Sequence, residues 1–305
     1  MADIGEIKAR MNSIAEIKKV TDAMYMISSV KMRKAKKYVS DTEPYFNALV
    51  EEISELFKYI PKTENRYFHS VTPNENVHSR RGILLITSDK GLSGTYNYTA
   101  VKVAEEYMSR HPETMLFIVG EYGRQYFKNK KIPFCKDFLY SSTIPTVLEA
   151  EKICIELLEY FDDNKLDEID IIYTDYRGGK PSECKRNCLL PLDRSQFNSV
   201  GRQTEKSFRE FYPDANTVLS EIIPSYLTGF IYGSLVDSYC SEQEARMTAM
   251  NTASSNAEEM LKKLKSQYNS IRQAAITNEM IEISSGARAL RAKHKKQSEA
   301  KKVEH

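Results

Sequence analysis

The longest regular hydrophobic pattern lies in residues 213–290. Apolar residues recur there every three or four positions, as on one face of an α-helix, among them Val218, Leu235, Met250, Leu264 and Ile283. At 1.5 Å per residue, about 75 helical residues would extend roughly 110 Å. An ordinary domain cannot cover such a helix, so we expect a second long helix or a surrounding assembly to cover its apolar face.

Residues 1–60 predict that second helix. Ile7, Ile14 and Met24 belong to a mostly heptad-like stripe, and Asp3 is a suitable N-cap. We expect Pro44 to kink or divide the helix, because proline lacks the backbone N–H and crowds the preceding turn. The two ends of the chain have similar helical patterns, and the middle has a different one. This predicts that the two terminal helices pair as a long antiparallel coiled coil that forms a shaft.

The middle of the chain has an α/β pattern. Short buried-strand patterns alternate with helical ones, and their ranges are 82–88, 115–119 and 169–174 for the strands and 98–110, 122–130 and 146–161 for the helices. This alternation predicts a Rossmann-like, mainly parallel α/β domain inserted between the shaft helices. An edge strand is expected near 188–192. The predicted parts are the shaft helix 1–60, a loop 61–81, the α/β domain 82–193, a connector 194–212, the shaft helix 213–290 and a frayed basic tail 291–305.

Charge is balanced overall but basic at one place. The chain has 305 residues, 44 of them basic and 42 acidic, with a net charge of +2. Five cations lie within two predicted helical turns, namely Lys31, Arg33, Lys34, Lys36 and Lys37. This basic run is compatible with a solvated helix face, an acidic protein partner or nucleic acid. Aromatic interleaving is confined to Tyr38, so nucleic acid is the least favoured partner.

Cysteine use and hydropathy indicate the compartment. The five cysteines have no regular spacing, and no secretory signal or transit pattern is present. No apolar run is long enough to span a bilayer. We therefore expect a reducing compartment and a protein that is soluble or peripheral on a membrane.

The candidate chemical motifs are incomplete. The glycine-bearing stretch from Ser88 to Asn97 lacks the third glycine of a dinucleotide fingerprint and the Gly-Lys-Ser/Thr ending of a P-loop. Cys184 and Cys188 have no second ligand pair nearby, although zinc needs four ligands. Arg177–Lys180 suggests either anion binding or a tight turn. We expect no catalytic residues, metal, cofactor or direct nucleotide binding.

Several motifs together resemble the γ subunit family of F-type ATP synthases. They are Ile7-Lys-Ala-Arg10, Val20-Thr-Asp-Ala-Met-Tyr-Met26, Val30-Lys-Met-Arg-Lys-Ala35, Thr87-Ser-Asp-Lys-Gly-Leu-Ser-Gly94, Ser241-Glu-Gln-Glu-Ala-Arg-Met-Thr-Ala-Met250 and Arg272-Gln-Ala-Ala-Ile-Thr-Asn-Glu279. The resemblance covers both ends of the chain and the first strand of the insertion. Ser93 stands where the family usually has cysteine, and residues 174–193 resemble nothing in the family.

The resemblance implies a rotor. In the family, one γ copy stands inside a ring of three α and three β subunits, and its foot meets ε and the c ring at the cytoplasmic face of the membrane. The shaft would couple proton or sodium flow to ATP synthesis or hydrolysis without being catalytic itself. The static alternative is a coiled-coil tether or scaffold, and the catalytic alternative is a Rossmann-type enzyme.

The resemblance also implies which residues meet the β subunits. They are Met24, Lys31, Arg33, Lys34, Asp89, Lys90, Gly91, Ser93, Arg246, Arg272, Gln273, Thr277 and Glu279.

Overall fold

The computed structural model describes residues 4–60, 65–68, 80–178, 180–197, 211–212 and 214–303. In chain order the elements are α1 (Ile4–Tyr59), β1 (Arg81–Ile86), α2 (Tyr96–Arg110), β2 (Met115–Val119), α3 (Glu121–Asn129), α4 (Val147–Asp162), β3 (Glu168–Asp175), β4 (Glu183–Leu190), the short 3-10 helix η1 (Arg194–Phe197) and α5 (Ala215–Val303). The contacts divide the chain into two compact units, Met24–Ala249 and Met1–Ala23 with Met250–His305. Most of the predicted loop 61–81 and of the connector 194–212 lies outside the described residues.

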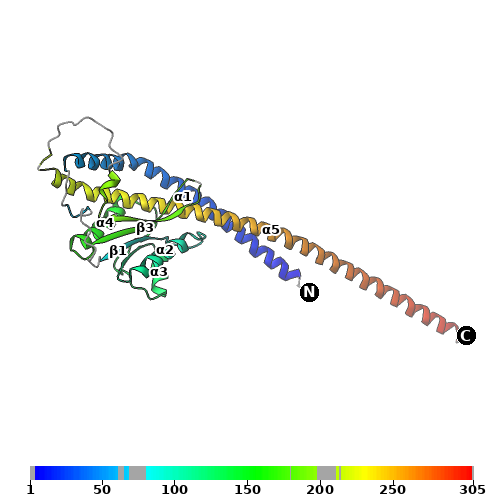
Figure 1. Cartoon of the computed structure of the whole chain (residues 1–305). Helices are drawn as coiled ribbons and strands as arrows, with labels where there is room; N and C mark the ends of the chain where they lie inside the picture. The colour runs from blue at the N-terminus through cyan, green and yellow to red at the C-terminus, as the bar shows by residue number, and fades with distance from the viewer. Residues whose placement is uncertain are drawn as a thin grey trace. The chain divides into compact units, whose positions relative to one another are not determined.

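The first of these units contains a four-stranded sheet in the order β2-β1-β3-β4 (Figure 1). β1 is parallel to both β2 and β3, while β4 is antiparallel to β3. The sheet is therefore mixed but mainly parallel. Each of the three buried-strand patterns forms one of its parallel strands.

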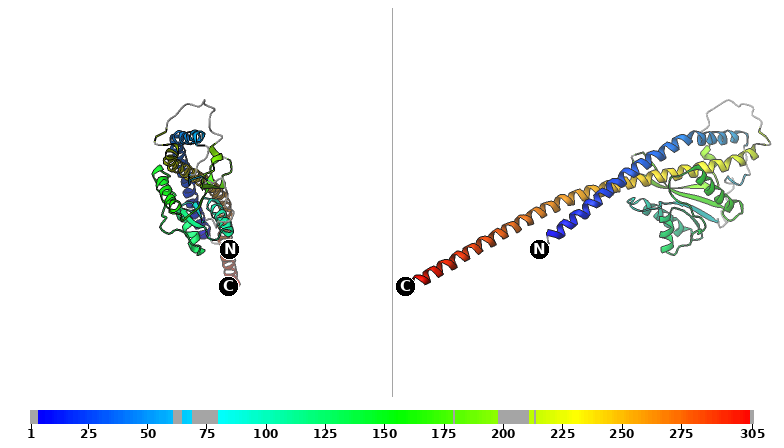
Figure 2. Two further views of the ribbon diagram at one scale, coloured as in Figure 1. Left: turned by 60° about the vertical axis from the view of Figure 1, so that its left-hand side comes forward. Right: turned by 180° about the vertical axis from the view of Figure 1, so that it is seen from behind.

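The sheet is covered on both faces, which is why its central strands are almost wholly apolar. Successive side chains of a strand point to opposite faces. Ile83 and Leu85 pack in one buried cluster with Ala100 and Val101 of α2. Leu84 and Ile86 belong to the other cluster, which contains residues of α1, α4 and α5. The yellow part of α5 runs beside the sheet in Figure 1 and in the right view of Figure 2.

The edge strand differs from its prediction. A strand near 188–192 was expected, but β4 spans Glu183–Leu190 and begins five residues earlier. Most side chains of β4 are half-buried or exposed, because an edge strand that faces solvent does not need an apolar run. Arg177, Gly178 and Lys180 lie in the connection between β3 and β4.

Helix α1 is not divided at Pro44, which lies inside it. Within the unit of residues 24–249, α1 and α5 are antiparallel neighbours. Phe46 lies against Gly229 of α5, and Lys36, ten residues earlier in α1, faces Cys240 further along α5. Buried residues near the end of α1, including Ile53 and Leu56, join the larger core.

The two helices also meet in the other unit. Ser254 of α5 donates a hydrogen bond of 2.5 Å to Oδ1 of Asp22 in α1. Lys18, one turn earlier in α1, faces Glu258, one turn later in α5, so this pair is antiparallel as well. The hydrogen bond from Ser254 and the ammonium of Lys18 lower the pKa of Asp22.

Helix α5 is longer than predicted. Asp214 accepts hydrogen bonds from the backbone N–H groups of Asn216 and Thr217, and this N-cap explains the start at Ala215 rather than at Pro213. The helix passes through Pro224 and continues to Val303, although we expected its regular part to end at Leu290. Ala, Lys, Gln and Glu dominate residues 291–303 and are good helix formers. No described helix combines the length and the apolar character that crossing a membrane requires.

All five cysteines are free thiols. Cys154 and Cys240 are buried, whereas Cys135, Cys184 and Cys188 are half-buried. Burial raises the pKa of Cys154 and Cys184 to about 11 and that of Cys188 and Cys240 to about 12.

Candidate functional site

The loop that follows β1 is held in shape from inside the sheet domain. Asn97, a buried residue in the first turn of α2, accepts a hydrogen bond of 2.9 Å from the Ser88 backbone N–H. Its amide nitrogen donates to the Ser88 hydroxyl at 2.6 Å. Leu92 and Gly94 have positive φ angles of 66° and 58° and bend the loop sharply. The exposed part of the loop comprises Lys90, Gly91, Leu92, Gly94 and Thr95.

Arg246 of α5 fastens this loop to the long helix. Its Nη2 donates to the carbonyl oxygens of Lys90 and Gly91, both at 3.1 Å, and lies 2.6 Å from Oε1 of Glu242. Arg246 and Glu242 are 8% and 5% exposed, so the pair is desolvated. Burial raises the pKa of Glu242, and the guanidinium acts in the opposite direction. Arg246 is thus a residue that positions the loop rather than one presented on the surface.

Asp89 also points into the chain. Its carboxylate accepts hydrogen bonds from the Glu121 N–H at 3.0 Å, the Ser141 hydroxyl at 2.5 Å and the Ser142 N–H at 3.0 Å. The first of these satisfies a free N–H at the start of α3. Ser93 is 2% exposed. Among the expected contacts in this loop, Lys90 and Gly91 are exposed, whereas Asp89 is half-buried.

The basic run of α1 is exposed at the positions where we expected contacts. Lys31, Arg33 and Lys34 are exposed, and Met24 is half-buried. Lys31 faces Glu242, whose pKa it lowers. The structure therefore gathers Lys31, the Glu242–Arg246 pair and the loop after β1 in one neighbourhood. Glu242 had not been assigned a role from sequence, although the i,i+4 spacing of Glu242 and Arg246 was a usable signal.

The remaining expected contacts lie in the other unit, on α5. Arg272, Gln273, Thr277 and Glu279 are all exposed. The Arg272 guanidinium lies 6.0 Å from the centre of the Tyr268 ring. The Thr277 hydroxyl donates to the Gln273 carbonyl at 2.8 Å. Apolar side chains accompany them in solvent, since Ile276, Met280 and Ile283 are 50%, 63% and 73% exposed.

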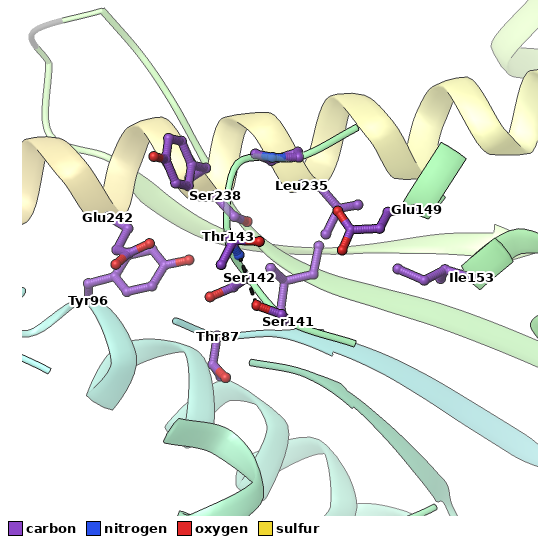
Figure 3. Close-up of a pocket in the computed structure, with 13 residues that line it drawn as sticks. Thr87, Tyr96, Ser141, Ser142, Thr143, Glu149, Ile153, Leu235, Ser238 and Glu242 are labelled. Carbon is purple, nitrogen blue, oxygen red and sulfur yellow. Dashed lines mark hydrogen bonds between the residues drawn. The ribbon is translucent and has the colours of Figure 1, made fainter. Parts of the chain in front are cut away.

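A small cavity lies behind the loop, between β1, the 141–143 segment, α4 and α5 (Figure 3). Its volume of about 10 Å³ has room for one water molecule. Ser142 Oγ and Tyr239 Oη, which belong to two of the lining residues, are buried and have no hydrogen-bond partner among the described residues. The cavity is far too small for a nucleotide.

A wider depression of about 560 Å³ adjoins the same loop. It is lined by hydroxyl-bearing residues of the loop, the β4 hairpin and α5, including Thr95, Ser182 and Thr248. Lys180 and Glu244 contribute opposite charges to its rim. This lining offers no set of convergent cations for a triphosphate.

Cys184 and Cys188, for which we expected no metal site, both lie in β4. Cys188 lies beside Glu168 and Asp170, with possible ligand atoms within 4.8 Å of one another. Arg81 Nε lies 3.1 Å from Glu168, and Arg186 Nη1 lies 3.6 Å from Asp170. Because each carboxylate already has a guanidinium neighbour, this cluster is an ion-pair network at the sheet edge.

The fold is shared with solved ATP synthase structures. A long helix, a mixed sheet and a second long helix are also arranged in this order in solved ATP synthase rotors. The central stalk and c-ring structure of the Tetrahymena thermophila mitochondrial ATP synthase matches with a TM-score of 0.57 and 22% identity, over 77% of this chain and 99% of that chain.

Sequence comparison is more specific. The family model described as ATP synthase matches residues 3–290. The ATP synthase gamma chain of Acetivibrio thermocellus is 36% identical over 297 residues, which cover 95% of this chain and all of the relative. That of Caldanaerobacter subterraneus is 36% identical over 291 residues, which cover 92% and 98%. The chain therefore belongs to the family of ATP synthase gamma chains.

Proposed function

We propose that the chain is the central rotor shaft of an F-type ATP synthase. The terminal helices would form a coiled-coil shaft, and the sheet would belong to a Rossmann-like domain inserted between them. Ion flow through the c ring would turn the shaft and force the catalytic β subunits through their conformational cycle. The chain itself would be non-catalytic and bind no nucleotide.

One observation carries this proposal. In the part of α5 after residue 264, described side chains that continue the apolar stripe lie in solvent, among them Ile276, Met280 and Ile283. Leaving such side chains in water costs about 1.5–3 kcal/mol each relative to full burial. A surrounding sleeve of other subunits removes this cost without a second copy of the chain. A static tether would cover the same stripe by self-association.

Polar contacts on the shaft are suited to repeated release. Lys31, Arg33 and Lys34 are exposed, and exposed ion pairs contribute only about 0–1 kcal/mol each. Weak contacts of this kind would favour one β conformation at each angle without holding it permanently. In thermodynamic terms the shaft couples the binding free energies of the three β sites.

The assembly that follows has one copy of this chain with three α and three β subunits, together with ε and the c ring. Its place would be the cytoplasmic face of the membrane, as a peripheral subunit. Support comes from the family membership and from the lack of a membrane-crossing helix among the described residues.

Affinity purification of the tagged chain from detergent-solubilised membranes tests the proposal. We expect α and β at three copies each per chain, and no heat of ATP or NAD binding when the isolated chain is titrated. Recovery of a homodimer without α and β would favour the tether. Micromolar nucleotide binding by the chain alone would favour the enzyme.

A further inference from the structure

Lys36 is an exposed residue of the basic run whose ammonium contacts the sheet domain. Its ammonium lies 4.4 Å from the centre of the Tyr176 ring and donates a hydrogen bond to the Tyr176 hydroxyl. Tyr176 directly follows the last residue of β3 and packs against the larger core cluster. The aromatic ring is thus fixed by the sheet domain, and the flexible lysine reaches it from α1.

The same hairpin is bound to the other long helix. The Thr174 backbone N–H donates to the Ser238 hydroxyl at 3.1 Å, and the Ser241 hydroxyl donates to the Thr174 carbonyl at 3.3 Å. Ser238 and Ser241 are both 1% exposed, so water cannot replace these bonds. Within two residues, Thr174 and Tyr176, the hairpin therefore contacts α5 and α1.

We propose that Lys36 is a positioning residue that fastens α1 to the β3–β4 hairpin, so that the hairpin ties both long helices to the sheet domain. The inference rests on the proposed rotor function, in which the shaft must carry torque without slippage between its helices. Ser238 and Ser241 fix the hairpin to α5 only. Apart from the core packing of α1, Lys36 supplies a polar contact that links α1 to this fixed hairpin.

The chemistry of the contact requires a cation at position 36. A lysine or arginine is attracted to the face of an aromatic ring, whereas an uncharged side chain of equal length is not. Lys37 is the matched control, since it is the next residue, carries the same charge and is exposed. Lys36→Met, Lys36→Arg and Lys37→Met therefore separate the contact from the general charge of the run.

The test uses the purified holoenzyme reconstituted in vesicles and measures ion-driven ATP synthesis relative to ATP hydrolysis. We expect Lys36→Met to lower this ratio roughly two- to five-fold, the range that an exposed cation–π contact supports. Lys36→Arg and Lys37→Met should remain close to the unchanged enzyme. Hydrogen exchange should be faster at the amides of residues 174–178 in Lys36→Met alone.

Tyr176→Leu provides a second arm. It should lower the ratio as Lys36→Met does, and the double variant should be no worse than either single one. Equal ratios for Lys36→Met and Lys37→Met would overturn the proposal. So would a loss in Lys36→Met without one in Tyr176→Leu, because Lys36 would then contact another subunit. The rotor proposal is judged separately, by recovery of α and β with each variant.

Discussion

Phe46 of α1 lies so close to Gly229 of α5 that a Cβ at position 229 would be 2.1 Å from Phe46 Cδ1. The Phe46 ring also lies 6.1 Å, centre to centre, from the ring of Tyr232, one turn along α5. Absence of a side chain at position 229 therefore sets how closely the two helices approach. A Cβ built at Gly233, which lies one turn after Gly229, would have no atom within 4 Å.

Gly229→Ala should destabilise the protein. Alanine favours helix by about 1 kcal/mol relative to glycine, but forcing an aromatic ring out of a packed contact costs about 1–3 kcal/mol. Gly233→Ala is the matched control and should be neutral or stabilising. Urea unfolding of both variants, followed by circular dichroism, measures the difference. Equal stability of the two would mean that Phe46 moves away freely.

Removing Arg246 should have two effects. Arg246→Ala leaves the Glu242 carboxylate buried without its partner, and breaking such a pair costs about 3–5 kcal/mol. It also releases the Lys90 and Gly91 carbonyls, so coupled synthesis should fall. Because Glu242 would then be costly to ionise, the loss of stability should be smaller at low pH. Thermal unfolding between pH 5 and pH 8 measures this dependence.

Arg272→Ala serves as the control for Arg246→Ala. Arg272 is exposed, so its removal should change stability by less than about 0.5 kcal/mol. A comparable loss of stability in both variants would contradict the positioning role of Arg246.

Asp237 gives the domain a pH dependence. Burial, and then the negative charge of Asp175, raise its pKa to about 7, while Lys185 acts in the opposite direction. A carboxyl group whose pKa is raised in the folded protein favours folding when it is protonated. Ionisation of Asp237 therefore lowers the stability of the folded state. That cost is absent below the ordinary pKa near 4, grows as pH rises, and is complete above about pH 7.

Asp237→Asn should remove this cost. The variant should be more stable than the unchanged protein at pH 8, by about 2 kcal/mol after allowance for solvent screening. The difference should disappear near pH 4. Urea midpoints at several pH values provide the measurement, and a constant difference across this range would show that Asp237 titrates normally.

Reversing the exposed charges of α1 should weaken coupling. Arg33→Glu with Lys34→Glu should reduce ion-driven synthesis more than assembly, and more strongly at low salt, where charges are less screened. Lys31 is better left unchanged, because it faces Glu242 within the chain. Lys128→Glu with Lys136→Glu makes an equal charge change at exposed positions elsewhere. If synthesis is unaffected at every salt concentration, the basic run is a solvated helix face that does not contact β.

Truncation after Leu290 should leave assembly and synthesis nearly unchanged. Helix α5 continues to Val303, but Leu290 and Arg291 at the start of this extension are already exposed. A short helix without packing is marginal in water and contributes little. ATP hydrolysis before and after truncation is the measurement, and a large change in either direction would assign the tail a regulatory role.

The parallel strands were predictable because each is a short apolar run buried on both faces. β1 and β3 begin within a residue of their predicted starts, at Arg81 and Glu168. The range of β4 was predicted wrongly, because an edge strand with lysine and arginine shows little hydrophobic periodicity. The end of α5 was misplaced because we judged the tail by its missing apolar stripe, whereas its residues have high helix propensity.

The direction in which the site residues point could not be predicted. Asp89 and Arg246, which we expect to meet another subunit, also have partners within the chain at large sequence separations. Asp89 reaches Glu121 and Ser141, and Arg246 reaches a loop more than 150 residues earlier. Such contacts depend on how the strands and helices assemble. Local pattern identifies the motif but not which side of it is buried.

The buried thiols have a practical consequence for labelling. A maleimide reacts with a thiolate, and burial keeps Cys154, Cys184, Cys188 and Cys240 protonated near neutral pH. Cys135 is half-buried beside Tyr160. A cysteine introduced at Leu139, which is 71% exposed, would therefore react first. A fluorophore could be attached there without first removing the other thiols.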